Sequence, residues 1–256
     1  MADWDGAGYE QISELQRTIA GRTLATLRLE GDERVLDVGC GDGFLTKHIA
    51  ARLPTGSATG IDASRRMITI ARERPEPPGA RLAFLVASAD ALPFRPAFDL
   101  VVSFNALHWV TDSEAALRAI AGAARPGGRE LLQFVCAGSR PSLEQVAMQV
   151  CAAARWSGWF DDFAAPFVHV EPAGYLALAG ECDLDVITSE VCDEVWRFGD
   201  AAAFRAWCTV GFADWTARLP VAERADWVAD VADRYTAVTG DPALFRFYQL
   251  VVELRR

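Results

Sequence analysis

The fold is decided by the stretch Arg34-Val-Leu-Asp-Val-Gly-Cys-Gly-Asp-Gly43. Its first five residues favour extended structure and predict a short buried strand. Three glycines at alternate positions then predict a tight turn, because glycine adopts positive φ without a steric penalty. Residues 44–53 follow with apolar side chains at helical spacing. The stretch therefore predicts a strand, a glycine turn and a helix in immediate succession.

The same type of unit recurs through the first half of the chain. Apolar residues at helical spacing from Ile12 to Leu27 predict an opening helix that ends near residues 30–32. Further strands are predicted at 57–61, 81–86, 98–104 and 129–135, and further helices at 64–74 and 112–124. Strands that alternate with helices of this length predict βαβ crossovers and a parallel sheet covered on both faces.

The second half is richer in alanine and tryptophan. Helices are predicted near residues 142–155, 200–218 and 221–238, and strands at 184–198 and 245–254. We expect these two strands to complete the sheet and the helices to cover its carboxyl edge. The predicted fold is α/β, a doubly wound, mostly parallel seven-stranded sheet with a helical lid. One domain is expected over residues 1–256, with a core at 34–135 and lid segments at 137–180 and 199–243.

Composition excludes several classes of protein. Hydrophobic residues make up 51% and charged residues 23% of the 256 residues, as in folded globular proteins. A net charge of −10 disfavours nucleic acid and anionic membrane surfaces as partners. The most apolar run, residues 100–110, is too short to cross a bilayer, and residues 1–6 lack the pattern of a secretory signal. Six dispersed cysteines without a C-x-x-C pair predict reduced thiols, no metal site and a cytoplasmic protein.

The glycine turn is also the expected ligand cradle. Open parallel sheets bind ligands beyond the carboxyl ends of their strands, and the N–H groups at a helix start favour an anion. A dinucleotide fingerprint would read G-x-G-x-x-G. Counting from Gly39 or Gly41 places Phe44 or Thr46 at the last position, so the sequence disfavours a nicotinamide dinucleotide.

An acid followed by G-x-G-x-G resembles motif I of the class I S-adenosylmethionine-dependent methyltransferases. Further matches follow in order: Asp62 after the second strand, Asp90 after the third, then residues 98–105 and 125–128. The resemblance spans residues 34–135 and implies S-adenosylmethionine as cofactor, with Asp62 at the ribose and Asp90 at the adenine. The cofactor-binding residues expected on this basis are Asp37, Gly39, Cys40, Gly41, Gly43, Asp62, Ala63, Ala89, Asp90 and Asn105.

Candidate acceptor-binding residues lie in two other places. Residues 105–109 (Asn-Ala-Leu-His-Trp) follow the fourth strand, and the opening helix carries Tyr9, Gln11 and Gln16. These features resemble the branch that contains trans-aconitate and juvenile hormone acid methyltransferases, which esterify carboxylates. The resemblance implies that Gln16 and Trp109 hold the acceptor carboxylate. Amide and indole N–H groups can donate to a carboxylate, which needs no base at pH 7.

Alternatives stay open at this point. His108 could be structural, or could act as general base for C-, N- or phenol O-methylation, and the chain could bind the cofactor without catalysis. The lid aromatics suit a large apolar acceptor, whereas Arg155, Arg197 and Arg205 would suit a polyacid. We expect a monomer or weak homodimer that acts on a small molecule, with no nucleic acid or membrane partner.

Overall fold

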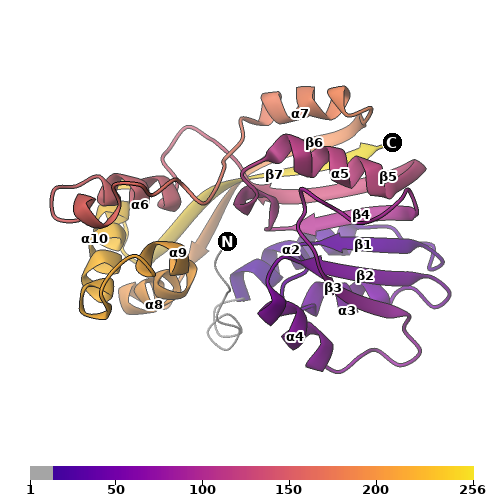
Figure 1. Ribbon diagram of the computed structural model, residues 1–256, viewed down its shortest axis with the longest axis horizontal. Helices are drawn as coiled ribbons and strands as arrows, with labels where there is room; N and C mark the ends of the chain where they lie inside the picture. Colours follow the sequence, from indigo (N-terminus) through magenta and orange to yellow (C-terminus); the bar gives the residue numbers. More distant parts are fainter. Residues whose placement is uncertain (1–13) are drawn as a thin grey trace.

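The computed structural model describes residues 14–256, and these contain one seven-stranded sheet of order β3-β2-β1-β4-β5-β7-β6 (Figure 1). The strands are β1 (Arg34–Val38), β2 (Ser57–Asp62), β3 (Leu82–Val86), β4 (Phe98–Phe104), β5 (Ala124–Val135), β6 (Asp185–Arg197) and β7 (Leu244–Arg255). Neighbouring strands from β3 across to β5 are parallel, while β7 is antiparallel to both of its neighbours. The predicted α/β class is confirmed, including the two late strands that complete the sheet.

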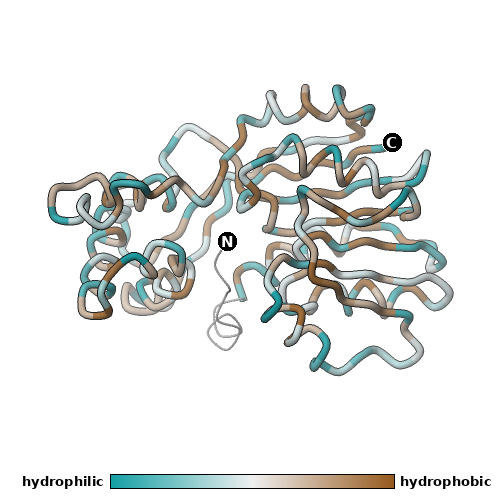
Figure 2. The backbone as a smooth tube through the Cα atoms, in the orientation of Figure 1, coloured by the Kyte–Doolittle hydropathy of each residue, from teal (hydrophilic) through white to brown (hydrophobic). Residues whose placement is uncertain are grey.

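Helices surround the sheet, and several of them begin at a side chain that caps the first turn. They are α2 (Glu14–Thr26), α3 (Phe44–Ala50), α4 (Arg65–Glu73), α5 (Ser113–Ala123), α6 (Leu143–Cys151), α7 (Pro172–Glu181), α8 (Ala201–Gly211), α9 (Ala213–Thr216) and α10 (Val221–Thr239), with short 3-10 turns η1 (Leu107–Trp109) and η2 (Ser157–Trp159). Ser64 accepts the N–H of Met67 at the start of α4, and Asp112 accepts that of Ala115 at the start of α5. Figure 2 shows hydrophobic and hydrophilic residues interspersed along these helices, as expected where one side is buried.

Both faces of the sheet are covered because successive residues of a strand point to opposite sides. Val35 packs in the cluster that contains residues of α2 and α3. Its neighbour Leu36 packs in the cluster formed with α5 and α7. Alternation along one short strand thus produces the doubly wound arrangement.

The helices α6, α8, α9 and α10 lie together beside the carboxyl edge of the sheet, on the left of Figure 1, and form the lid. Their shared core is aromatic, and Trp156, Trp215 and Trp227 are fully buried in it. The first part of β7 reaches the same cluster through Phe245 and Phe247. The lid is therefore joined to the sheet through a strand as well as through loops.

Two predicted segments differ from the structure. Helix α7 falls in the segment 137–180 assigned to the lid, yet it packs on the sheet, where Tyr175 contacts the ring of Phe134 edge-on at 4.9 Å. The residues of α7 are small or apolar on most sides of the helix, so their spacing does not mark a single buried face. The one helix predicted over residues 200–218 is two helices, α8 and α9, which meet at Phe212.

Tyr9, Gln11 and Ile12, expected at the start of the opening helix, lie outside the described residues. Within residues 14–256, no helix combines the length and the apolar character needed to cross a membrane.

Candidate active site

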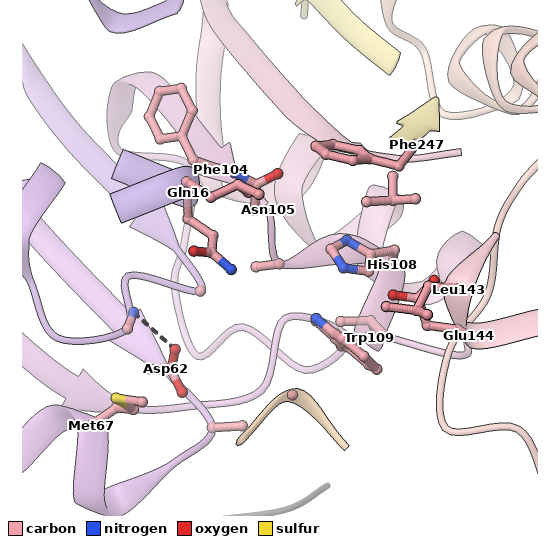
Figure 3. A pocket seen from close by; sticks show the side chains of 18 of the residues that line it. Gln16, Asp62, Met67, Phe104, Asn105, His108, Trp109, Leu143, Glu144 and Phe247 are labelled. Atoms are coloured by element: carbon pink, nitrogen blue, oxygen red, sulfur yellow. Dashed lines mark hydrogen bonds between the residues drawn. The ribbon is translucent and has the colours of Figure 1, made fainter. Parts of the chain in front are cut away.

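One cavity runs from the glycine turn after β1 to the lid (Figure 3). Its sheet side is lined by Gly39, Asp62 and Ala89, and its lid side by residues that include Trp207 and Phe212. The carboxyl ends of β1, β2 and β4 meet at this edge, which is where open parallel sheets bind ligands. The topology therefore brings the predicted cofactor motifs and the lid to a common space.

The turn after β1 needs glycine at two positions for steric reasons. Gly39 has a φ of 76° and Gly43 a φ of 74°. A Cβ at Gly39 would lie 2.1 Å from the Cβ of Ala106, and one at Gly43 would lie 2.7 Å from the ring of Phe84. The backbone of this turn thus packs directly against the segment after β4, leaving its cavity side open to a ligand.

Asp62 ties the end of β2 to the glycine turn. Its carboxylate accepts the N–H of Gly41 at 3.0 Å and that of Ser64 at 2.8 Å, and it lines the cavity (Figure 3). Burial raises the pKa of this carboxyl, while the two N–H donors oppose the rise. Ala63 beside it lines the cavity too. Asp62 therefore faces the ligand space and stabilises the turn at once.

Asp37 lies behind the turn. It is buried, accepts a hydrogen bond from the Thr46 hydroxyl at 2.6 Å, and lines a smaller neighbouring cavity together with Cys40. Burial raises its pKa to about 7, against the lowering effect of the Thr46 hydroxyl. Asp37 and Cys40 thus support the turn from outside the larger cavity.

Asn105 is held by a relay of amides that the sequence did not reveal. Gln249 Nε2 of β7 donates to Asn105 Oδ1 at 2.5 Å, and Gln133 Nε2 of β5 donates to Gln249 Oε1 at 2.8 Å. Asn105 has a φ of 55°, and its buried Nδ2 has no hydrogen-bond partner among the described residues. The signal that was available is glutamine at inward positions of two strongly apolar strands. The relay therefore fixes the amide of Asn105, a residue that lines the cavity.

Among the expected cofactor residues, Gly43 lines neither of these two cavities. Asp90 also lies apart from the others. It is exposed, accepts a hydrogen bond from the Ser88 hydroxyl, and does not line the cavity. Its neighbours Ala87 and Ala89 do line it.

The expected acceptor residues converge on the cavity. Gln16 of α2, together with His108 and Trp109 of η1, lines it, and Figure 3 shows the Gln16 amide nitrogen and the Trp109 indole nitrogen turned toward the same space. His108 is buried, and burial lowers its pKa well below the ordinary value, with nearby His169 adding to the effect. The two imidazole rings lie 6.2 Å apart. His108 is therefore a neutral imidazole at pH 7.

Glu144 is a further polar residue that sequence reasoning missed. It lies in the first turn of α6, is buried and lines the cavity beyond His108 (Figure 3). Its Oε2 lies 3.8 Å from His169 Nε2, and burial lowers the pKa of that histidine. Only the topology could have placed this residue, since it lies in the first turn of an ordinary amphipathic helix.

Comparison with known proteins identifies the family. A family model described as a methyltransferase domain matches residues 35–128. A trans-aconitate 2-methyltransferase of Methylobacterium radiotolerans is 31% identical over 81% of this chain and 78% of its own length. The chain belongs to the class I S-adenosylmethionine-dependent methyltransferases. The relative places this methyltransferase in the branch that the sequence resembled.

Solved structures agree with the fold of this methyltransferase. The YcgJ protein of Bacillus subtilis superposes with a TM-score of 0.66 at 18% identity, over 92% of this chain and 97% of that one. Phosphoethanolamine N-methyltransferase 2 of Haemonchus contortus, in complex with S-adenosyl-L-methionine, superposes with a TM-score of 0.63 at 16% identity, over 98% of this chain and 56% of that one.

The cofactor of this methyltransferase is S-adenosylmethionine, and the site fits it in two respects. The amide Nδ2 of Asn105 is a buried donor that lacks a partner among residues 14–256. Gly39 brings the backbone to the cavity wall at a place where a side chain would be excluded. Within the same residues, no group of three or more His, Cys, Asp or Glu side chains is arranged to hold a metal ion.

Proposed function

We propose that this methyltransferase transfers the methyl group to a carboxylate oxygen of a small molecule. The observation that carries the proposal is the arrangement of Gln16 and Trp109, two neutral N–H donors on separate elements that face one space in the cavity. The name of the trans-aconitate 2-methyltransferase relative supports an acid as acceptor.

The cofactor residues in the proposal are the glycine turn at residues 39–43, Asp62, Ala63, Ala89 and Asn105, with Asp37 and Cys40 behind the turn. S-adenosylmethionine supplies a methyl group already activated on a sulfonium. The Asp62 carboxylate accepts hydrogen bonds from hydroxyl groups of the cofactor at the end of β2. The Asn105 amide donates to an acceptor atom at the end of β4. Asp90 is proposed at the adenine amino group on the family resemblance alone, since it stands outside the cavity.

Gln16 and Trp109 orient the acceptor. Their N–H groups donate to a carboxylate without neutralising it, so the second oxygen keeps the charge it needs for attack. Holding the two reacting groups near attack distance supplies much of the rate enhancement in such a displacement. The aromatic rings of Trp207 and Phe212 exclude water from the same space.

Proton transfer also favours an acid. A carboxylic acid is already ionised at pH 7, so its methylation needs no base. His108 is neutral, and its lowered pKa makes it a weak acceptor of a proton from a phenol or an ammonium group. A base-dependent acceptor is the second candidate, favoured by the Nδ1 of His108, which has no hydrogen-bond partner within residues 14–256.

The chemical bond formed tests the proposal directly. The protein is incubated with methyl-labelled S-adenosylmethionine and a pooled extract of small molecules, and the products are treated with mild alkali. We expect label to leave as methanol, because methyl esters hydrolyse under these conditions. Label that resists alkali contradicts the proposal and favours the base-dependent acceptor.

Two tryptophans provide a matched pair of variants. Trp109→Phe removes one indole N–H from the proposed clamp, and we expect kcat/KM to fall about tenfold or more, the weight of a hydrogen bond to a charged group. Trp159→Phe removes an indole N–H from a tryptophan that does not line the cavity, and serves as control. A large loss in His108→Ala with little loss in Trp109→Phe would reverse the assignment.

A further inference from the structure

We infer that the acceptor is an acid with one carboxylate on an apolar body, and that Glu144 excludes acids carrying a second carboxylate. The inference rests on the proposed function, because it takes the reacting group to be the carboxylate held by Gln16 and Trp109. It departs from a trans-aconitate acceptor, which carries three carboxylates.

The cavity offers no cation to a second carboxylate. No lysine or arginine lines it among residues 14–256, and residues 1–13 contain neither type. Arg17 is nearby but lines the smaller neighbouring cavity. Its guanidinium is paired with Asp42 at 2.6 Å and lies over the ring of Phe44, 4.4 Å from the centroid. Arg17 thus belongs to an ion-paired group with Asp42 and Arg74, which lies 2.8 Å from the same carboxylate, and it does not line the larger cavity.

The three arginines that would suit a polyacid are paired with other side chains outside the cavity. Each forms an ion pair with an aspartate, and none lines the cavity. The pairs are Arg155 with Asp226 at 2.7 Å, Arg197 with Asp241 at 2.8 Å, and Arg205 with Asp233 at 2.5 Å. All three guanidiniums are about half exposed, at 51%, 61% and 45% of their side-chain area. Arg155 and Arg205 therefore belong to the outer surface of the lid, and Arg197 to the end of β6.

The polar groups that do line the lid side would repel a second carboxylate or leave it unpaired. Glu144 presents a buried carboxylate, and its neighbour His169, 3.8 Å away, does not line the cavity. Burial lowers the pKa of both His108 and His169, so neither provides positive charge at pH 7. Like charges brought together in a desolvated site are strongly unfavourable.

The rest of the lid side suits hydrocarbon. Leu143, Trp207, Phe212, Phe245 and Phe247 line it, all of them buried. An apolar body placed there gains the free energy of leaving water without needing any polar partner. One end of the cavity thus takes a single charge, and the other takes apolar surface.

Matched acids of equal chain length test the inference. Octanoate and octanedioate differ in one carboxylate, and kcat/KM for each is measured with labelled S-adenosylmethionine, alongside hexanoate to dodecanoate, 3-phenylpropanoate and trans-aconitate. We expect the best monoacid to exceed both octanedioate and trans-aconitate by about a hundredfold, as a like-charge contact of several kcal/mol implies. Preference for the polyacids overturns the inference while leaving carboxylate methylation intact.

Glu144→Gln then tests the assigned residue. We expect the ratio of kcat/KM for octanedioate to that for octanoate to rise at least about tenfold, because the variant removes the repelling charge and keeps the shape. Glu181→Gln removes an exposed charge at the end of α7, and we expect it to leave the ratio unchanged. An unchanged ratio in Glu144→Gln overturns its role.

The panel includes a phenol and a primary amine with the same apolar body. Methylation of these and of no acid overturns the proposed function and the inference together. Failure to methylate any monoacid, combined with no thermal shift from the monoacids in the presence of S-adenosylhomocysteine, overturns the inference as well.

Discussion

The sheet side and the lid side of the cavity are built in different ways. The sheet side is formed by backbone and short side chains, with Gly39 pressed against Ala106 and the Asp62 carboxylate bonded to the turn. The lid side is formed by large rings such as Trp207 and Phe212, which belong to one aromatic cluster. The cofactor side therefore depends on local conformation, whereas the acceptor side depends on packing between distant segments.

Damage to the lid core is the largest expected perturbation. Trp215 is fully buried and contacts Trp109, Phe163, Phe167 and Phe212. We expect Trp215→Ala to reduce the free energy of unfolding by about 3–5 kcal/mol, as for other large-to-small core substitutions. Urea unfolding measures it. If the cofactor side is independent of the lid core, the folded variant binds S-adenosylhomocysteine with an affinity within about threefold of the parent. Equal losses of cofactor and acceptor affinity would show that the two sides are not independent.

The second largest expected effect is a loss of cofactor affinity caused by substitution in the glycine turn. Gly39→Ala brings a Cβ to 2.1 Å from that of Ala106, and we expect affinity for S-adenosylhomocysteine to fall about a hundredfold by titration calorimetry. Gly127→Ala is the control, because Gly127 has a similar φ of 77° but nothing within 4 Å of an added Cβ. Equal affinities in the two variants would show that the contact with Ala106 does not matter.

Asp62 and Asp90, two of the three acids expected to bind the cofactor, differ in their position relative to the cavity. Asp62→Asn removes a charged acceptor for two backbone N–H groups at the cavity, and we expect about a tenfold loss of cofactor affinity. Asp90→Asn changes an exposed residue outside the cavity, and we expect less than about a threefold loss. A larger effect at Asp90 would mean that the residues after β3 move inward when the cofactor binds.

Asp37 and His108 make the stability of the fold depend on pH in opposite directions. The folded-state pKa of Asp37 is raised to about 7, so the folded state binds more protons than the unfolded state between about pH 4 and 7, and stability falls as pH rises there. The pKa of His108 is lowered, so its contribution is lost as pH falls below the ordinary value near 6.5. Urea unfolding from pH 5 to 8 separates them.

We expect Asp37→Asn to make stability rise more steeply with pH than in the parent, and His108→Gln to make it rise less. Each change is at most about 1.4 kcal/mol per pH unit, the slope for one proton. Parallel curves in all three proteins would show that neither group titrates differently on folding.

The features that could be predicted from the sequence are the ones set by local conformation, and those missed depend on packing between distant segments. The order of β1 to β5 and the glycine turn are written in local patterns, so they were predicted within a few residues. Glu144 carries no local signal, because lid packing brings it to the cavity from α6. Gln249 shows only as a glutamine in an apolar strand, and strand pairing brings it to Asn105, 144 residues away along the chain. Helix α7 was misplaced because its even apolar surface does not indicate what it packs against.

Strand β7 has a consequence for how the lid is attached. Phe245, Phe247 and Gln249 lie on one face of it, the first two in the aromatic cluster and the third in the relay to Asn105. Four residues of extended chain make a strut of roughly 13 Å between the two sides of the reaction space. Because a shift of one residue turns every side chain to the other face, this strut can change length only in steps of two. The distance along β7 from the aromatic cluster to the Asn105 relay is therefore set in units of two strand residues, roughly 7 Å.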